Sequence, residues 1–455
     1  MSAAVPAGIT PTPFTASGSG PGDRLVLLDV LRGLAILGIL WRNIFVFGMP
    51  YLAYAFLSVL PSETAADRLT QIFVSVFAEG TMRAIISMVF GAAALLIMTA
   101  PAQGADPFAS VDRYYRRLLW LAAFGLVHAY LLLWPHDILF LYGVLGLVLF
   151  PFRNMAPRSL AVLALVLLAF STVIEGSGWR QVGNAFDAAP EEAALQAPVV
   201  LASVGADTDA GSLPELDPQG VPEEVVVAIG EEILQRLSGY AENFRLLAAD
   251  SLEQQTTELL THHILDITSM MFLGMALLKW GVLSGRAAPG TYRRLALWGG
   301  LAGVVFGVIA HDSIIGFEPL VDFSLDWGDY FFEVRRLAFA LAVVGAMGWL
   351  TTAGRLPALR AWLADAGRMA LTLYVMQTVL CIFLFYGFGL GLFGALSATA
   401  LLVLAFVING AQLVFARLWM ARFGKGPLER LIAWLIAWTP RAGAAAGEGQ
   451  GARNH

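Results

Sequence analysis

The residues LVLLDVLRGLAILGILWRNIFVFG, at positions 25–48, indicate the class of fold. A helix rises about 1.5 Å per residue, so this mostly apolar run of 24 residues is long enough to cross the hydrocarbon core of a membrane. Similar runs recur along the 455-residue chain, which is 58% hydrophobic and 14% charged and has a mean hydropathy of +0.70. A soluble domain carries about 25% charged residues. We therefore expect an all-α, polytopic integral membrane protein whose main partner is a lipid bilayer.

The apolar runs predict about ten transmembrane helices, at Leu25–Gly48, Thr81–Met98, Arg117–Trp134, Ile138–Phe152, Leu160–Ile174, Ile264–Val282, Leu295–Ile309, Phe332–Leu350, Met369–Tyr386 and Leu396–Phe415. Every second connection between them is rich in arginine and lysine, for example Arg153 and Arg158 after the fourth run and Arg355 and Arg360 after the eighth. Short cytoplasmic loops retain an excess of these residues. The pattern predicts that both termini are cytoplasmic.

The same analysis divides the chain into five parts. These are a flexible N-terminal tail (1–23) without the basic start of a signal peptide, a first membrane half of about five helices (24–174), an extracytoplasmic insert (175–263), a second membrane half (264–425) and an amphipathic C-terminal segment and tail (426–455). Within the insert, Asp187–Pro222 has the composition of a disordered segment and Glu223–His263 that of one or two helices. The apolar stretch Gln71–Ala78 is too short to span, so we expect it in the interface or as an extension of the second helix.

Charge and cysteine content exclude other classes of protein. The arginines lie at the ends of the predicted helices rather than on one solvated face, so no nucleic-acid partner is expected. Cys381 is the single cysteine, which excludes an internal disulfide bond. The net charge of −6 says little, because the charges are segregated by membrane side.

Polar residues form a stripe along the first predicted helix. Asp29 and Arg32 are three residues apart and therefore neighbours on one helical face. Asn43 follows Arg32 by eleven residues, about three turns, so it shares that face at another depth. Ionisable groups inside a membrane cost at least about 2.5 kcal/mol each near the centre, so they have partners or line a wet path. Two interpretations stay open: a structural Asp29–Arg32 ion pair, or the lining of a substrate path.

Several segments together resemble the YeiB-like family of bacterial membrane proteins. They are LLDVLRG (27–33), WRN (41–43), FAEG (77–80), SMVFG (87–91), RRLL (116–119), GLVH (125–128), DIL (137–139), GRMALTLYVMQ (367–377), the glycine-rich stretch 387–394 and GPLE (426–429). The resemblance runs in order over most of the chain, excepting the tail and the 175–263 insert. It implies a multi-pass protein of the bacterial cytoplasmic membrane.

That family is similar to the wider transmembrane acyltransferases, which include heparan-alpha-glucosaminide N-acetyltransferases and bacterial surface-sugar O-acyltransferases. The resemblance implies acyl-CoA, such as acetyl-CoA, as a co-substrate entering from the cytoplasm, with a small-molecule or glycan acceptor. An arginine pair of the O-acyltransferases corresponds to Arg113 and Arg116, which together with Arg117 would bind the CoA phosphates, since guanidinium groups bind phosphate bidentately. A positive-inside signal alone explains the same arginines.

The catalytic histidine of the O-acyltransferases lies eleven residues after an arginine, which makes Asn43 its counterpart here. Asparagine cannot act as a general base, so His128 is the best replacement. It lies inside the third predicted helix, about 16 Å along the axis from Arg117, and we expect it to face the bundle in a polar cavity shared with Arg32 or Asn43. A histidine bonded between helices is the simpler alternative. His136 with Asp137 is the rival base, in a loop that water reaches.

Three histidine-bearing loops fall on the predicted outer side, at His136–Asp137, at His262–His263 with Asp266, and at His311–Asp312. They favour either a His–Asp site facing the acceptor or ordinary loop polarity. No HExxH-like or Cys/His spacing is present, so no metal is expected. Glu79 and Arg83 are four residues apart and are predicted to pair.

Three functions therefore remain open. The first is an integral membrane acyltransferase that moves an acyl group from cytoplasmic acyl-CoA to a hydroxyl or amine acceptor, with Asp29, Arg32 and Asn43 along its path. The second is a secondary transporter or exporter that uses the same residues, and the third is a membrane-embedded binding or sensing protein. No inverted repeat is detectable, which disfavours transport slightly.

Overall fold

The computed structural model describes residues 25–55, 64–100, 109–187, 223–310 and 328–438, and within these ranges the chain is helical without a β-strand. The first half contains α1 (Val26–Gly48), α2 (Tyr51–Ala55), α3 (Ala65–Phe73) with η2 (Val74–Ala78), α4 (Thr81–Met98), α5 (Ala109–Leu126) with η3 (Val127–Leu131), α6 (Ile138–Gly146) with η4 (Leu147–Phe152) and α7 (Pro157–Asp187). The second half contains α9 (Glu223–Leu237), α10 (Tyr240–Gln255), η6 (Leu259–His263), α11 (Ile264–Lys279), α12 (Pro289–Ala310), α14 (Gly328–Thr352), α15 (Pro357–Arg368), α16 (Ala370–Phe385), α17 (Ala398–Phe423) and α18 (Pro427–Trp438).

The all-α membrane fold predicted from the apolar runs is confirmed. Among the residues that the structure describes, seven helices are long and apolar enough to cross a membrane, and eight if the bent pair α15 and α16 forms one span. The count of ten and the cytoplasmic location of both ends stay predictions. Helix α5 begins with the charged residues of a predicted connection, and α6 with η4 is apolar but shorter than the others.

Some helix boundaries differ from those predicted. Helix α5 begins at Ala109 and passes into a π-helical turn that ends at Leu131, so it starts earlier than Arg117. Helix α7 continues to Asp187, past the expected end at Ile174, through the more polar residues that follow the apolar run. The short apolar stretch 71–78 extends the second helix, since α3 and η2 lead into α4 across a break at Glu79 and Gly80. The predicted N-terminal tail and most of the predicted disordered segment lie outside the described residues.

Helix α1 lies at the centre of the bundle and packs against α15, α4, α16 and α17. Its closest approach is to α15. A Cβ atom on Gly33 would overlap the carbonyl group of Leu363, and one on Gly367 would overlap the carbonyl group of Asp29. Small residues let helix backbones come this close, which maximises van der Waals contact where lipid supplies no hydrophobic driving force.

Helices α15 and α16 meet at a bend of 79° next to Met369. The bend exposes the first amide groups of α16, and Glu429 from α18 satisfies them. Its carboxylate accepts hydrogen bonds from the backbone amides of Leu371 (2.9 Å) and Thr372 (3.1 Å) and from the Thr372 hydroxyl (2.6 Å). The amphipathic helix α18 is thereby attached to the bundle and leaves Trp434 and Trp438 exposed, as expected of a helix lying along a membrane surface.

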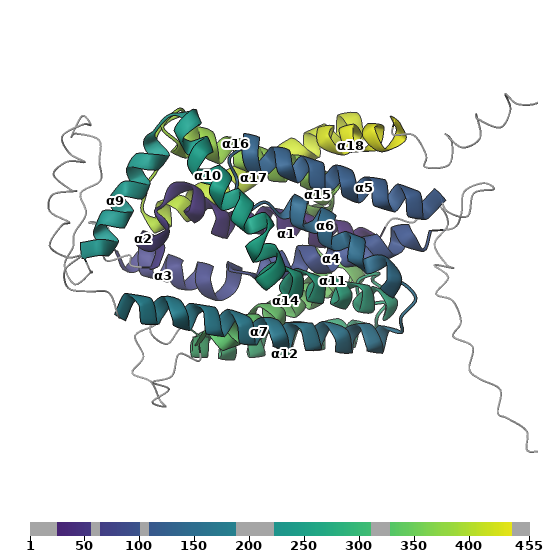
Figure 1. The fold of residues 1–455 in the computed structure, drawn as a ribbon. Helices are drawn as coiled ribbons and strands as arrows, with labels where there is room; N and C mark the ends of the chain where they lie inside the picture. The colour runs from purple at the N-terminus through teal and green to yellow at the C-terminus, as the bar shows by residue number, and fades with distance from the viewer. Residues whose placement is uncertain (1–24, 56–63, 101–108, 188–222, 311–327, 439–455) are drawn as a thin grey trace, which may run out of the picture.

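The second half of the predicted insert forms two helices, α9 and α10, at one end of the bundle (Figure 1). Helix α9 packs on α2, which follows α1 directly. The backbone amide of Gly387 donates to the carbonyl of Arg236 (3.1 Å), and the Tyr240 hydroxyl donates to that of Leu131 (2.9 Å). The insert helices are therefore attached to the membrane bundle at several points.

Candidate functional site

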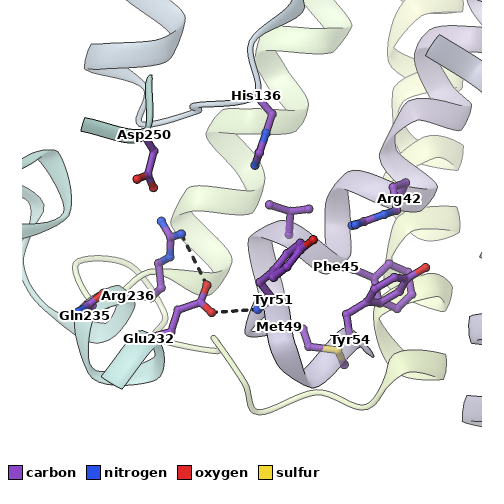
Figure 2. A pocket seen from close by; sticks show the side chains of 11 residues that line it. Arg42, Phe45, Met49, Tyr51, Tyr54, His136, Glu232, Gln235, Arg236 and Asp250 are labelled. Atoms are coloured by element: carbon purple, nitrogen blue, oxygen red, sulfur yellow. Dashed lines mark hydrogen bonds and ion pairs between the residues drawn. The ribbon is translucent and has the colours of Figure 1, made fainter. Parts of the chain in front are cut away.

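A cavity of about 300 Å³ opens where the insert meets the end of α1 (Figure 2). Four elements besides α1 contribute to it: α2, the loop before α6, α9 and α10. The lining residues are Arg42, Phe45, Val46, Met49, Tyr51, Tyr54, His136, Glu232, Gln235, Arg236 and Asp250. These segments are far apart in the sequence, and all belong to the predicted extracytoplasmic side.

Charged side chains face each other across this cavity. The Arg42 Nε atom donates to Glu79 (2.9 Å), and the guanidinium carbon lies 4.5 Å from the centre of the Tyr54 ring. On the insert side, Arg236 is 3.7 Å from the Glu232 carboxylate. Glu232 also accepts a hydrogen bond from the backbone amide of Tyr51 (2.9 Å), which joins the insert to the end of α1.

The electrostatic surroundings of the cavity change two pKa values. Desolvation lowers the pKa of the His136 imidazole to about 4, and the charges of Arg42, Arg236 and Arg83 act in the same direction. Burial raises the pKa of the Glu232 carboxyl. His136 is thus neutral at physiological pH and lies in a positive field.

A second polar cluster lies deeper in the bundle, around His128. Its Nδ1 atom is 2.7 Å from Asp137, and its Nε2 atom is 2.8 Å from the Thr378 hydroxyl on α16. His128 and Thr378 are each only 1% exposed. The Tyr374 ring lies 4.9 Å from the imidazole ring, and its hydroxyl accepts a hydrogen bond from the indole of Trp134 (3.0 Å).

This geometry differs from the predicted surroundings of both histidines. Asp137 was expected beside His136, but it contacts His128 instead, because it caps α6 by accepting from the amide of Phe140 (2.7 Å) and its other oxygen faces η3. The cavity described here is lined by His136 and not by His128, Arg32 or Asn43. Both ring nitrogens of His128 are occupied by side-chain partners, so it packs closely in the bundle.

The other predicted residues gather at the opposite end of α1. Arg32 lies 3.3 Å from Asp29, with the two side chains 28% and 11% exposed. The charges of Arg32 and Glu429 both act on Arg117, so these three groups share one polar region. Asn43 is not among them: it follows Arg42 near the cavity end of α1, where it is half-buried.

Of the arginines predicted to bind CoA, Arg116 is the most constrained. It contacts Asp112 (2.5 Å) and donates to the carbonyl of Ile436 in α18 (2.6 Å). Arg113 and Arg117 are exposed on α5.

A third cluster is ionic and buried. Asp266, which is 2% exposed, lies 2.8 Å from Arg83 and also pairs with Arg336, whose Nε atom donates to Glu333 (2.6 Å). The expected Glu79–Arg83 pair is replaced by contacts between helices, because Arg42 and Asp266 approach these residues from α1 and α11.

The outer histidines of η6 have local partners. His262 contacts Glu258 (2.6 Å), and the ring of His263 contacts Gln254 (3.1 Å). The predicted His311–Asp312 pair lies outside the described residues. Across the described ranges, no group of three or more His, Cys, Asp or Glu side chains is arranged to hold a metal ion.

Comparisons with known proteins show what this chain is similar to. Residues 277–439 match the family model described as "Protein of unknown function (DUF418)". The chain is 29% identical over 443 residues to the uncharacterized protein YxaH of Bacillus subtilis (strain 168), covering 92% of this chain and 96% of that one. It is 27% identical over 414 residues to the uncharacterized protein YeiB of Escherichia coli (strain K12), covering 90% and 95%. These matches support the resemblance to the YeiB-like family over most of the chain. No solved structure matches it.

The matched region of this protein contains the bent pair α15 and α16 with α17 and α18. The motif at 27–33 and the motif at 367–377, distant in sequence, meet where Gly33 contacts α15 and Gly367 contacts α1. Part of what the motifs specify is therefore this close helix contact.

Several residues of the clusters were not found from the sequence of this chain. Arg42 is the exception, because a charged residue in an apolar helix stands out in the sequence. Thr378 and Tyr374 carry no such signal, because a hydroxyl group in an apolar helix is common. Glu232, Arg236 and Asp250 lie in a helical segment rich in charges, where nothing in the sequence separates a lining residue from a solvated one.

Proposed function

We propose that this protein is an integral membrane acyltransferase, which moves an acyl group from cytoplasmic acyl-CoA to a hydroxyl or amine acceptor. The observation that carries the proposal is the buried set formed by Asp137, His128 and Thr378. A carboxylate accepts only, so it fixes the proton of the neutral imidazole on Nδ1 and leaves Nε2 as an acceptor. Nε2 already meets a hydroxyl group at 2.8 Å, a distance at which a general base takes a proton.

The proposed reaction needs a base because the acceptor must lose a proton as it attacks the thioester. In this scheme Nε2 of His128 takes that proton, a bond forms between the acceptor and the acyl carbon, and the bond from that carbon to sulfur breaks. The proton then passes to the CoA thiolate. Asp137 stabilises the imidazolium that forms between the two steps.

The donor side of the scheme rests on the arginines of α5. Arg113 and Arg117 are exposed and so are accessible to the phosphates of CoA, while Arg116 is engaged by Asp112. The acceptor side rests on the cavity around His136, which opens at the other end of α1. Trp134 joins this cavity to the His128 cluster, since its indole packs near the ring of His136 (5.5 Å between ring centres) and donates to Tyr374.

A secondary transporter is the second candidate, and broken helices favour it. The bend of 79° between α15 and α16 and the break at Glu79 and Gly80 interrupt two apolar segments. At the second break Arg335 donates to the backbone carbonyls of Val76 and Glu79. Interrupted helices bind substrates and coupling ions in transporters.

The test uses the full chain, purified into lipid nanodiscs and supplied with radiolabelled acetyl-CoA and an extract of bacterial envelope lipids and glycans. We expect acetyl-CoA to bind, free thiol to be released, and label to enter the extract. The change His128→Gln should abolish release and transfer but retain acetyl-CoA binding. His262→Gln, which alters a histidine bonded to Glu258, is the matched control. Absence of acetyl-CoA binding would favour the transporter, and full activity of His128→Gln would exclude that histidine as the base.

A further inference from the structure

We infer that the cavity between α1 and the insert binds a small ligand that carries both an anionic group and an ammonium group. The class of ligand follows from the cavity alone, and only its role as acyl acceptor rests on the proposed function. With a volume of about 300 Å³ the cavity is at the lower end of the range for small-molecule sites, which limits the bound part to a compact headgroup or free zwitterion.

The anionic group would lie between Arg42 and Arg236. Arg42 donates to Glu79 through Nε, which leaves its two Nη groups for a ligand, and a guanidinium binds carboxylate or phosphate through two parallel hydrogen bonds. Arg236 approaches from the insert, and its 3.7 Å separation from Glu232 is longer than a hydrogen bond. Figure 2 shows His136 above the space between these two arginines.

The ammonium group would lie beside Asp250. Its carboxylate projects toward the cavity from α10, on the side away from Arg42 (Figure 2), and within the described residues no hydrogen bond or ion pair holds it. The half-exposed ring of Tyr51 lies between the two sides and offers a face to a cation.

The balance of charges excludes a simple anion as the best ligand. The lining contains two arginines, Arg42 and Arg236, and two carboxylates, Glu232 and Asp250. A ligand with one negative charge would leave Asp250 repelling it, whereas a ligand with both charges satisfies the cations on α1 and α9 and the carboxylate on α10 together. Two sources have this chemistry: a soluble zwitterion, and the headgroup of an aminophospholipid.

Calorimetric titration of the full chain in nanodiscs of phosphatidylglycerol, without acyl-CoA, tests the inference. O-phosphoethanolamine is the probe, and ethyl phosphate and ethanolamine carry its two charges separately. We expect the zwitterion to bind about tenfold or more tighter than either half, since each half loses one charged contact. Ethyl phosphate binding as tightly as O-phosphoethanolamine, or no detectable binding of any probe, would overturn the inference.

Variants then assign the contacts. Asp250→Asn and Arg236→Gln should each weaken binding of O-phosphoethanolamine about tenfold, while Asp250→Asn should leave binding of ethyl phosphate equal or tighter. Glu253→Gln is the matched control, because Glu253 is exposed on the same helix and does not line the cavity. Unchanged binding in both cavity variants would overturn the inference.

A repeat in nanodiscs containing phosphatidylethanolamine distinguishes the two sources. Weaker binding of O-phosphoethanolamine in these nanodiscs means that the lipid competes for the cavity and assigns it to a lipid headgroup. Undiminished binding assigns the cavity to a soluble zwitterion. Either result supports the same ligand chemistry. Because no acyl-CoA is present, failure of this test leaves the proposed acyl transfer untouched, and failure of acyl transfer leaves the binding result standing.

Discussion

Asp137 holds two structural elements at once: one carboxylate oxygen caps α6 by accepting from the amide of Phe140, and the other lies 2.7 Å from Nδ1 of His128. The loop between η3 and α6 folds back so that these residues, nine positions apart, meet inside the bundle. The orientation of the imidazole is thus coupled to the start of the next helix.

Replacement of Asp137 by asparagine should separate its two roles. The amide oxygen can still cap α6, but the amide nitrogen would donate to Nδ1 and force the ring proton onto Nε2, which could no longer accept from a hydroxyl. We expect the protein to fold with a nearly unchanged melting temperature and acyl transfer to fall by about 10²–10⁴-fold. Transfer at the wild-type rate by a well-folded Asp137→Asn variant would contradict the proposed role.

The contact between α1 and α15 should tolerate no added side-chain atom. Gly33→Ala places a methyl group against the carbonyl of Leu363, and the forced separation of the helices should cost about 1–3 kcal/mol or more. Thermal unfolding of the wild type and the variant in detergent measures this loss of stability. Gly230→Ala is the control, since that glycine has open space around its Cα on α9 and alanine favours the helix by about 1 kcal/mol.

Two ion pairs of this protein should differ sharply in their effect on stability. Asp266→Asn removes the partner of Arg83 and one of the two carboxylate partners of the fully buried Arg336, and it should cost about 3–5 kcal/mol. Asp29→Asn removes the partner of Arg32, which is 28% exposed, and should cost at most about 1 kcal/mol. Equal losses in chemical denaturation would show that Asp29 is as desolvated as Asp266.

His136 should make the protein less stable in mild acid. Its pKa is about 4 in the folded protein and about 6.5 in an unfolded chain, so between these values only the unfolded state binds the proton. Stability should therefore fall as the pH drops from about 6.5 toward 4, and it should be unaffected above that window. The melting temperatures of the wild type and of His136→Gln are compared at pH 7.5 and at pH 5.0. Because both proteins carry the same carboxylates, the change in this difference with pH reports the contribution of His136. A difference that does not change with pH would be the contradicting result.

The predicted orientation can be tested with single cysteines in a Cys381→Ser background. Arg245→Cys, on the exposed face of α10, should react with an impermeant maleimide in intact cells, and Pro289→Cys, at the start of α12, should react only after the membrane is opened. Labelling of position 289 in sealed cells would contradict the alternation of basic connections.

The class of fold and most of the helices follow from the pattern of apolar residues. Each of the ten apolar runs coincides with helical segments of the structure to within a few residues, and the helix 81–98 has the predicted bounds. The thickness of the bilayer and the need to satisfy every backbone hydrogen bond leave few alternatives for such runs. The amphipathic segment 427–438 is likewise the helix its pattern indicated.

Which polar groups meet depends on how the helices pack. Helical periodicity correctly paired Asp29 with Arg32, since neighbours on one helix are determined by local geometry. It wrongly paired Glu79 with Arg83, because arginine and aspartate side chains from α1 and α11 come closer than the next turn of the same helix. The approach of Thr378 to His128 and of the insert to Arg42 depends on packing between segments hundreds of residues apart, which no local pattern in one sequence encodes.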